Sequence, residues 1–85
     1  MIEHRTHPQF WICFNQLPLP AQQQAVRAFE HMLENPFHPS IHLKQSGSYW
    51  SARAGLRYRA LAVRKADVFT WFWIGTHREY EKLIQ

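Results

Sequence analysis

The residues best suited to chemistry follow an apolar stretch near the C-terminal end of the sequence. All seven residues from 68 to 74 are β-branched or aromatic, which favours a buried strand that stops at Gly75. Thr76 and Glu79 then have the T-x-x-E spacing of a capping box, so we expect a short helix to begin there. His77 would lie in its first turn, where unpaired backbone N–H groups attract anions and an imidazole titrates near neutral pH. The segment therefore predicts that a rigid strand positions His77 at a site that can bind an anion.

Basic residues are concentrated in the second half of the chain. The 85 residues include ten Lys and Arg against six Asp and Glu, a net charge of +4. No acidic residue occurs between Asn35 and Ala66, and this uneven charge favours a polyanion partner, although solvated strand charges would give the same pattern. The basic residues in this interval are Lys44, Arg53, Arg57, Arg59, Arg64 and Lys65.

The elements that must position these residues begin with two amphipathic helices. From Pro8, apolar residues recur at helical spacing until the run Pro18-Leu19-Pro20 interrupts the pattern. A second helix with an alanine-rich stripe follows and ends at Asn35. The short polar segment 1–6 fits either a frayed end or an edge strand. We expect the two helices to form a hairpin that covers a sheet.

Strand patterns fill the remainder of the chain. Short turns separate the segments, which predicts an antiparallel meander. We therefore expect one α+β domain over residues 1–85, with an N-terminal helical hairpin packed on a three- to four-stranded antiparallel sheet and a short C-terminal helix. The strand segments are 41–45, 49–54, 57–65 and 68–74.

Side-chain alternation sorts the strand residues onto two faces. One face carries small and apolar side chains and can pack on the helices. The other carries tyrosine, serine and arginine, and we expect it to direct its basic groups toward His77. The first face includes Trp50, Ala52, Ala54, Tyr58, Ala60 and Ala62, and the second includes Tyr49, Ser51, Arg53, Arg57, Arg59, Leu61 and Val63.

Several other classes of protein are disfavoured. Cys13 is a single cysteine and cannot form an internal disulfide. The six histidines do not have the spacing of a metal site, so we expect no metal and no cofactor. Because neither a signal peptide nor an apolar run of 18 residues is present, we expect a soluble, cytoplasmic protein that does not bind membranes.

Three stretches together resemble one known family. Tyr49 to Gly55, Tyr58-Arg59-Ala60 and residues 74–80 are similar to motifs of the RelE/ParE superfamily of type II toxin–antitoxin toxins, and the similarity extends over nearly the whole chain. This resemblance implies two helices against an antiparallel sheet and a cognate antitoxin as partner. It also implies a target: RelE-like toxins cleave messenger RNA on the ribosome without metal, whereas ParE-like toxins poison DNA gyrase.

The resemblance also implies roles for individual residues. Arg59 corresponds to an arginine that contacts the scissile phosphate, and Arg53 would be a second phosphate clamp. His77 would act as general base or acid, and Tyr80 lies near the C-terminal tyrosine of these toxins. Such RNA cleavage needs a base for the 2′-OH, cations for the phosphorane and an acid for the leaving oxygen. Further candidates for binding RNA phosphates are Lys44 and Arg57.

Structural roles compete with some of these assignments. Glu79 fits a helix cap better than a catalyst, and Tyr80 fits a core position as well as a catalytic one. Trp71 and Trp73, on one face of the last strand, could stack on bases, but core packing explains them better. A basic module that binds RNA without cleaving it also remains compatible with the sequence.

Overall fold

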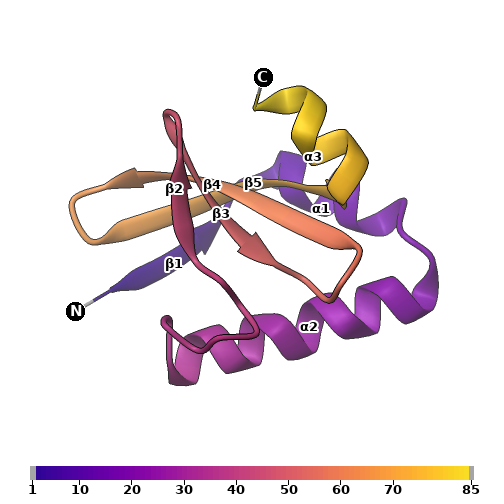
Figure 1. The fold of residues 1–85 in the computed structure, drawn as a ribbon, viewed down its shortest axis with the longest axis horizontal. Helices are drawn as coiled ribbons and strands as arrows, with labels where there is room; N and C mark the ends of the chain where they lie inside the picture. The colour runs from indigo at the N-terminus through magenta and orange to yellow at the C-terminus, as the bar shows by residue number, and fades with distance from the viewer. Residues whose placement is uncertain (1, 85) are drawn as a thin grey trace.

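The computed structural model describes residues 2–84, so Met1 and Gln85 of the predicted domain lie outside it. Three helices surround one five-stranded sheet, and the α+β class predicted from the sequence is confirmed (Figure 1). The elements in chain order are β1 (Glu3–Thr6), α1 (Pro8–Asn15), α2 (Leu19–Glu34), β2 (Lys44–Ser46), β3 (Tyr49–Arg53), β4 (Tyr58–Lys65), β5 (Val68–Thr76) and α3 (His77–Leu83).

The two N-terminal helices lie where the sequence indicated, although α1 already ends at Asn15, before the proline break. Pro8 opens α1, and the preceding His7 caps it by accepting a hydrogen bond from the backbone N–H of Gln9 at 3.0 Å. Pro20 lies in the first turn of α2, and Asn35 ends that helix. None of the helices within residues 2–84 is both long and apolar enough to cross a membrane.

The sheet is larger than predicted because the N-terminal segment joins it. The strand order is β1-β5-β4-β3-β2; β2 to β5 form the expected antiparallel meander, while β1 pairs in parallel with β5. The prediction of three or four antiparallel strands was therefore wrong in number and in the direction of one edge strand. The segment is polar and only four residues long, so its own sequence could not reveal that 3–6 would pair with 68–71.

Several strand boundaries also differ from the prediction, and β5 continues through Gly75 to Thr76 because both residues still pair with β4. Ile41 is buried but precedes the strand, which begins at Lys44, and His42 between them has a positive φ of 50° that interrupts the extended backbone. In addition, β4 begins at Tyr58, so Arg57 lies in the connection before the strand and not within it. The direction of the Arg57 side chain is therefore set by the turn and not by the alternation of side chains along β4.

One face of the sheet packs against α1 and α2. Figure 1 shows α2 along one side of the sheet and α3 on the opposite side. The face toward α2 carries the predicted small residues of β3 and β4, and Cys13 of α1 is free and packs partly buried against this core. The buried residues of this hydrophobic core are Ala25, Met32, Ile41, Ala52, Ala54, Ala60, Ala62, Phe69, Trp71 and Ile74.

A β-bulge in β5 separates the two tryptophans that simple alternation placed together. Leu61 pairs with Trp73 and Ala62 with Trp71, so Phe72 is an extra residue in the ladder. Trp71 belongs to the core under the helices, whereas Trp73 shares the opposite face with its partner Leu61. The predicted common face of Trp71 and Trp73 was therefore wrong, because one inserted residue reverses the side on which the strand continues.

Candidate functional site

The C-terminal helix starts where the capping box predicted. The Thr76 hydroxyl accepts from the Glu79 backbone N–H at 3.1 Å, and the Glu79 carboxylate accepts from the Thr76 N–H at 2.9 Å. The Thr76 backbone N–H and hydroxyl both donate to the Glu79 carboxylate and hold its pKa below the usual value. Glu79 is thus used for capping, as the sequence indicated, and its charge belongs to the helix start.

His77 is the first residue of α3 and lies at the surface. Its side chain is 45% exposed, and Nδ1 lies 3.2 Å from Oε1 of Glu81, one turn further along the helix. The imidazole stacks on the ring of Tyr80 at a centroid distance of 5.9 Å. The backbone N–H of His77 donates to the carbonyl of Arg57 at 2.8 Å. Since that N–H and the Glu79 N–H are both occupied, the predicted anion site at the helix start has two fewer donors than expected.

Tyr80 reaches down from α3 to a small cluster of hydroxyl groups on the sheet. Its oxygen lies 3.0 Å from Oγ of Ser46 on β2 and donates to Oγ of Ser51 on β3 at 3.3 Å. The two serine oxygens are 3.5 Å apart, so the three groups form a closed triangle, the hydroxyl cluster. Tyr80 is 4% exposed, Ser51 is 1% exposed and Ser46 is partly buried, and the three hydroxyl groups satisfy one another.

The surroundings of this cluster lower the pKa of Tyr80. Burial by itself would raise the pKa of Tyr80. The hydrogen bonds from Ser46 and Ser51, with the nearby charges of Lys44 and Arg59, outweigh burial and hold the pKa below its usual value. Tyr80 therefore lies in a positive potential that comes from β2 and β4 together.

Arg53 and Arg59 form a cross-strand pair on the same side of the sheet. They are direct partners in the β3–β4 ladder, and both are half-buried. Burial lowers the pKa of Arg59, and so does the adjacent charge of Arg53, while Tyr80 opposes the shift. Like charges directly opposite each other destabilise a sheet, so this pair lowers the stability of the fold, and a bound anion would offset the repulsion. An Nη1–H of Arg59 donates to the carbonyl of Tyr58 at 2.9 Å, which fixes the side chain.

The structure thus brings most of the predicted site residues to one face. Arg59 pairs with Gly75 on β5, two residues before His77, and Gly75 is needed because an added Cβ would lie 2.4 Å from the Trp73 ring. Lys44 is exposed on β2, opposite Ser51. Arg57, by contrast, is exposed in the connection before β4. We call the side of the sheet that carries Arg53, Arg59, Tyr80 and His77 the open face, because α1 and α2 cover the other side.

Sequence reasoning missed the roles of two serines. Ser51 was placed on the polar face, but Ser46 was read as part of a turn, and neither was connected with Tyr80. Their contacts join β2, β3 and α3 across 34 and 29 residues of chain. The available signal was that Ser51 alternates with other polar residues along its strand. Without the register of the neighbouring strands, however, the sequence does not show whether its hydroxyl is buried or solvated.

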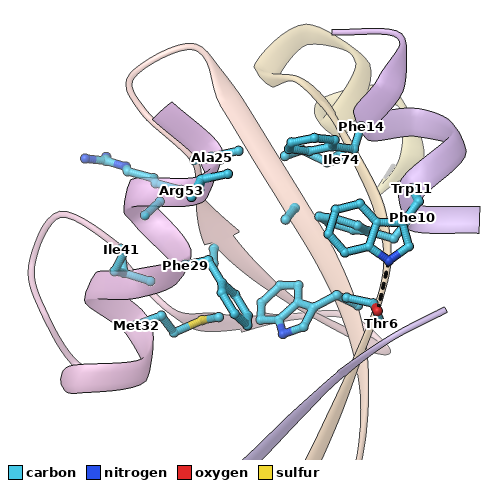
Figure 2. Close-up of a pocket in the computed structure, with 16 residues that line it drawn as sticks. Thr6, Phe10, Trp11, Phe14, Ala25, Phe29, Met32, Ile41, Arg53 and Ile74 are labelled. Carbon is cyan, nitrogen blue, oxygen red and sulfur yellow. Dashed lines mark hydrogen bonds between the residues drawn. The ribbon is translucent and has the colours of Figure 1, made fainter. Parts of the chain in front are cut away.

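A second feature, the apolar cavity, lies on the helix side of the sheet. It has a volume of about 250 Å³ and an almost wholly apolar wall, so it offers no group for acid–base chemistry. Figure 2 shows aromatic rings of α1 and α2 facing each other across it, with the Trp11 indole donating to the Thr6 hydroxyl at 3.0 Å, and the Arg53 guanidinium directed away. The lining residues include Phe10, Trp11, Phe14, Val26, Phe29, Met32, Trp71 and Ile74.

The histidines outside the open face have separate local roles. His4 accepts from the Trp71 indole, His7 caps α1, and the His31 and His38 rings stack at 5.1 Å. Over residues 2–84, no three or more His, Cys, Asp or Glu side chains come together in a way that could hold a metal ion.

Comparison with known proteins identifies the fold. No family model and no curated protein sequence matches the chain. Solved structures do match: the RelB–RelE antitoxin–toxin complex from Methanococcus jannaschii aligns with a TM-score of 0.71 at 10% identity, covering 95% of this chain and 99% of the other. RelBE2 from Mycobacterium tuberculosis gives 0.65 at 18%, covering 89% and 98%. The isolated E. coli RelE toxin gives 0.61 at 14%, covering all of both chains.

These similarities extend over 89–100% of the chain and define its fold. Two helices on one side of a mostly antiparallel sheet, followed by a short C-terminal helix, form the fold of RelE-type toxins. The fold that the three sequence stretches indicated is therefore confirmed. At identities of 10–18%, the similarity concerns the fold, and the activity must be argued from the residues of the site.

Proposed function

We propose that this chain is the toxin of a type II toxin–antitoxin pair and acts as a metal-independent, ribosome-associated mRNA endoribonuclease. The observation that carries the proposal is the half-buried cross-strand pair Arg53 and Arg59, whose member Arg59 pairs with Gly75, two residues before His77. The RelE fold of the chain adds support, since solved toxins of antitoxin pairs have it.

The geometry suits cleavage of RNA by its own 2′-OH. A base removes the 2′-OH proton, the oxyanion attacks the adjacent phosphorus, and the 5′ oxygen leaves with a proton from an acid. Arg53 and Arg59 would neutralise the charge that accumulates on the phosphorane. The Nδ1 atom of His77 is engaged by Glu81, so we assign proton transfer to Nε2. Lys44 would extend phosphate binding along β2, and Arg57 would extend it at the edge of the site.

The catalytic role predicted for Tyr80 stays a prediction. In this structure its hydroxyl is bound to Ser46 and Ser51 and is buried, so direct contact with RNA requires the ring to leave the hydroxyl cluster. While Tyr80 is bound there, it anchors α3 to the sheet and supports the His77 ring that stacks on it. In that position it is a positioning residue.

The test is cleavage of mRNA on ribosomes by the purified protein. His77→Ala should slow cleavage at least about a hundredfold, the lower end of general acid–base catalysis. His31→Ala, which removes an exposed histidine of α2, should leave the rate unchanged. An unaltered rate in His77→Ala would remove His77 from the mechanism.

The same experiments distinguish the other candidate functions. Growth arrest with intact mRNA and a DNA-damage response would replace the nuclease proposal by a gyrase-directed one. Salt-sensitive RNA binding without cleavage would instead indicate a binding module without turnover.

The helix side offers a surface for the antitoxin. Leu19, Val26 and Leu33 recur every seven residues along α2 and are exposed, as are Trp11 and Ile12 of α1. Two of these residues, Trp11 and Val26, also line the apolar cavity. An amphipathic segment of a partner could insert apolar side chains there, as coupled folding and binding requires. Co-expression with the product of an adjacent gene should restore growth, and Val26→Asp should weaken that rescue. Equal rescue of Val26→Asp would show that the antitoxin binds elsewhere.

A further inference from the structure

The open face carries an apolar patch that the proposed reaction does not use. The rings of Tyr49 on β3 and Phe72 on β5 lie 5.2 Å apart between centroids and are tilted by 57°. Val63 of the intervening strand β4 is exposed on the same face. We call Tyr49, Val63 and Phe72 the aromatic patch.

The sheet register places this patch on the open face and not in the core. Tyr49 pairs with Ser46, whose hydroxyl belongs to the hydroxyl cluster, and alternates with Ser51 and Arg53 along β3. Phe72 is the extra residue of the β5 bulge, and bulges often redirect side chains beside functional sites. Tyr49 is 36% exposed, so part of this aromatic side chain remains open to solvent.

Charge around the patch favours an anionic ligand. Lys44 of β2 and Lys65 of β4 are exposed, and alternation puts both on the open face, Lys44 with Ser46 and Lys65 with Val63. The interval from Asn35 to Ala66, which contains β2, β3 and β4, has no carboxylate. An apolar surface flanked by cations, on strands β2 to β4 that contain no carboxylate, matches single-stranded nucleic acid, whose bases stack while its phosphates pair with the cations.

We propose that the aromatic patch is a stacking site for an unpaired base of single-stranded RNA whose phosphates reach the pair Arg53 and Arg59. Tyr49 and Arg53 are four residues apart on one strand, about 13 Å at the usual rise, so the base lies beyond the nucleotide at the arginines. The inference rests on the proposed action on RNA and adds a binding subsite to it. Recognition here is by stacking and accepts any base, since every base has a π face.

The test is equilibrium binding of a short unstructured RNA, without ribosomes, to the full chain carrying His77→Ala, which slows any cleavage during the measurement. Tyr49→Ala should lower affinity about 5- to 100-fold without changing the salt dependence, because stacking releases no counterions. Tyr49→Trp should bind as well as the parent. Arg59→Ala should also weaken binding, but with a salt slope smaller by about one.

A second arm assigns the effect to a base. A series of RNAs carries one abasic nucleotide, placed at each position of the strand in turn. At one position, the loss of affinity for the parent protein should equal the loss that Tyr49→Ala causes with intact RNA. Combining that abasic RNA with Tyr49→Ala should then weaken binding no further. Phe72→Leu, which keeps an apolar side chain without a ring, should give a similar loss if the fold is intact by thermal unfolding. If the affinity losses from the abasic nucleotide and from Tyr49→Ala add at every position, the proposed stacking site is wrong.

The outcomes separate this inference from the proposed function. If Tyr49→Ala binds like the parent while Arg59→Ala binds less well, the stacking site is wrong and the RNA function stands. If the parent binds no RNA at low salt and cuts none on ribosomes, both are wrong.

Discussion

The two faces of one sheet have opposite characters in this protein. The face under α1 and α2 is apolar, consists largely of alanine and aromatic side chains, and borders the apolar cavity. The open face carries the arginine pair, the buried hydroxyl cluster and an exposed histidine. Both faces come from alternate residues of the same strands, so Ala52 packs in the core while its neighbours Ser51 and Arg53 belong to the site.

This difference shows how a small domain can combine stability with a destabilised site. The helix face supplies apolar burial, the main favourable contribution to folding. On the open face, Arg53 and Arg59 repel each other, and burial lowers the pKa of Arg59. Strain of this kind is stable only where the remaining structure enforces it. Separate variants on each face can test whether the two roles are divided in this way.

The largest expected effect is on the helix face. Trp71→Ala should lower the free energy of unfolding by about 3–5 kcal/mol, since it removes a buried indole from the core and leaves a cavity. Trp73→Ala, two residues away on the open face, should cost less because Trp73 is only partly buried. Urea unfolding of both variants measures the difference. Equal losses would contradict the division that the β5 bulge creates.

A smaller loss is expected for the hydroxyl cluster. Tyr80→Phe removes the oxygen that bonds to Ser46 and Ser51 and should cost about 1–3 kcal/mol, because a buried serine loses a partner. Tyr49→Phe, which removes an exposed hydroxyl from the same face, should change stability by less than about 0.5 kcal/mol. If Tyr80→Phe were equally neutral, the cluster would not hold α3.

The smallest effect is a pH dependence from β1 on the helix face. His4 Nδ1 accepts from the Trp71 indole at 3.1 Å, while its buried Nε2 has no partner within residues 2–84, and burial lowers the pKa of His4 from its usual 6.5. The folded state therefore binds fewer protons than the unfolded chain, and stability should fall as pH drops below 6.5, by at most about 1.4 kcal/mol per unit.

Variants identify the residue responsible for that slope. His4→Phe should flatten the dependence, since a phenyl ring fits among the surrounding Phe29, Phe69 and Trp71 rings without titrating. His31→Gln, at an exposed position of α2, should leave it in place. Denaturant unfolding at pH 7.5 and 5.0 gives the comparison, and an unchanged slope in His4→Phe would assign it to another group.

Local sequence rules predicted where helices and strands occur more accurately than which strands pair with one another in the sheet. The capping box of Thr76 and Glu79 and the prolines that start and end the helices act over a few residues, so their effects can be read from the sequence. The pairing of β1 with β5 joins residues about 65 positions apart, which no local pattern encodes. The bulge at Phe72 escaped prediction for a related reason, because it is defined only by the partner strand.

The chain by itself therefore determined its α+β class, the approximate positions of its helices and of four strands, and the identity of its chemically capable residues, since periodicity, capping and turn propensity are properties of adjacent residues. The tertiary structure alone decided how those residues meet. It set Arg53 opposite Arg59, buried Tyr80 on Ser46 and Ser51, and left His77 exposed beside them, because strand register and the docking of α3 depend on contacts between distant parts of the chain.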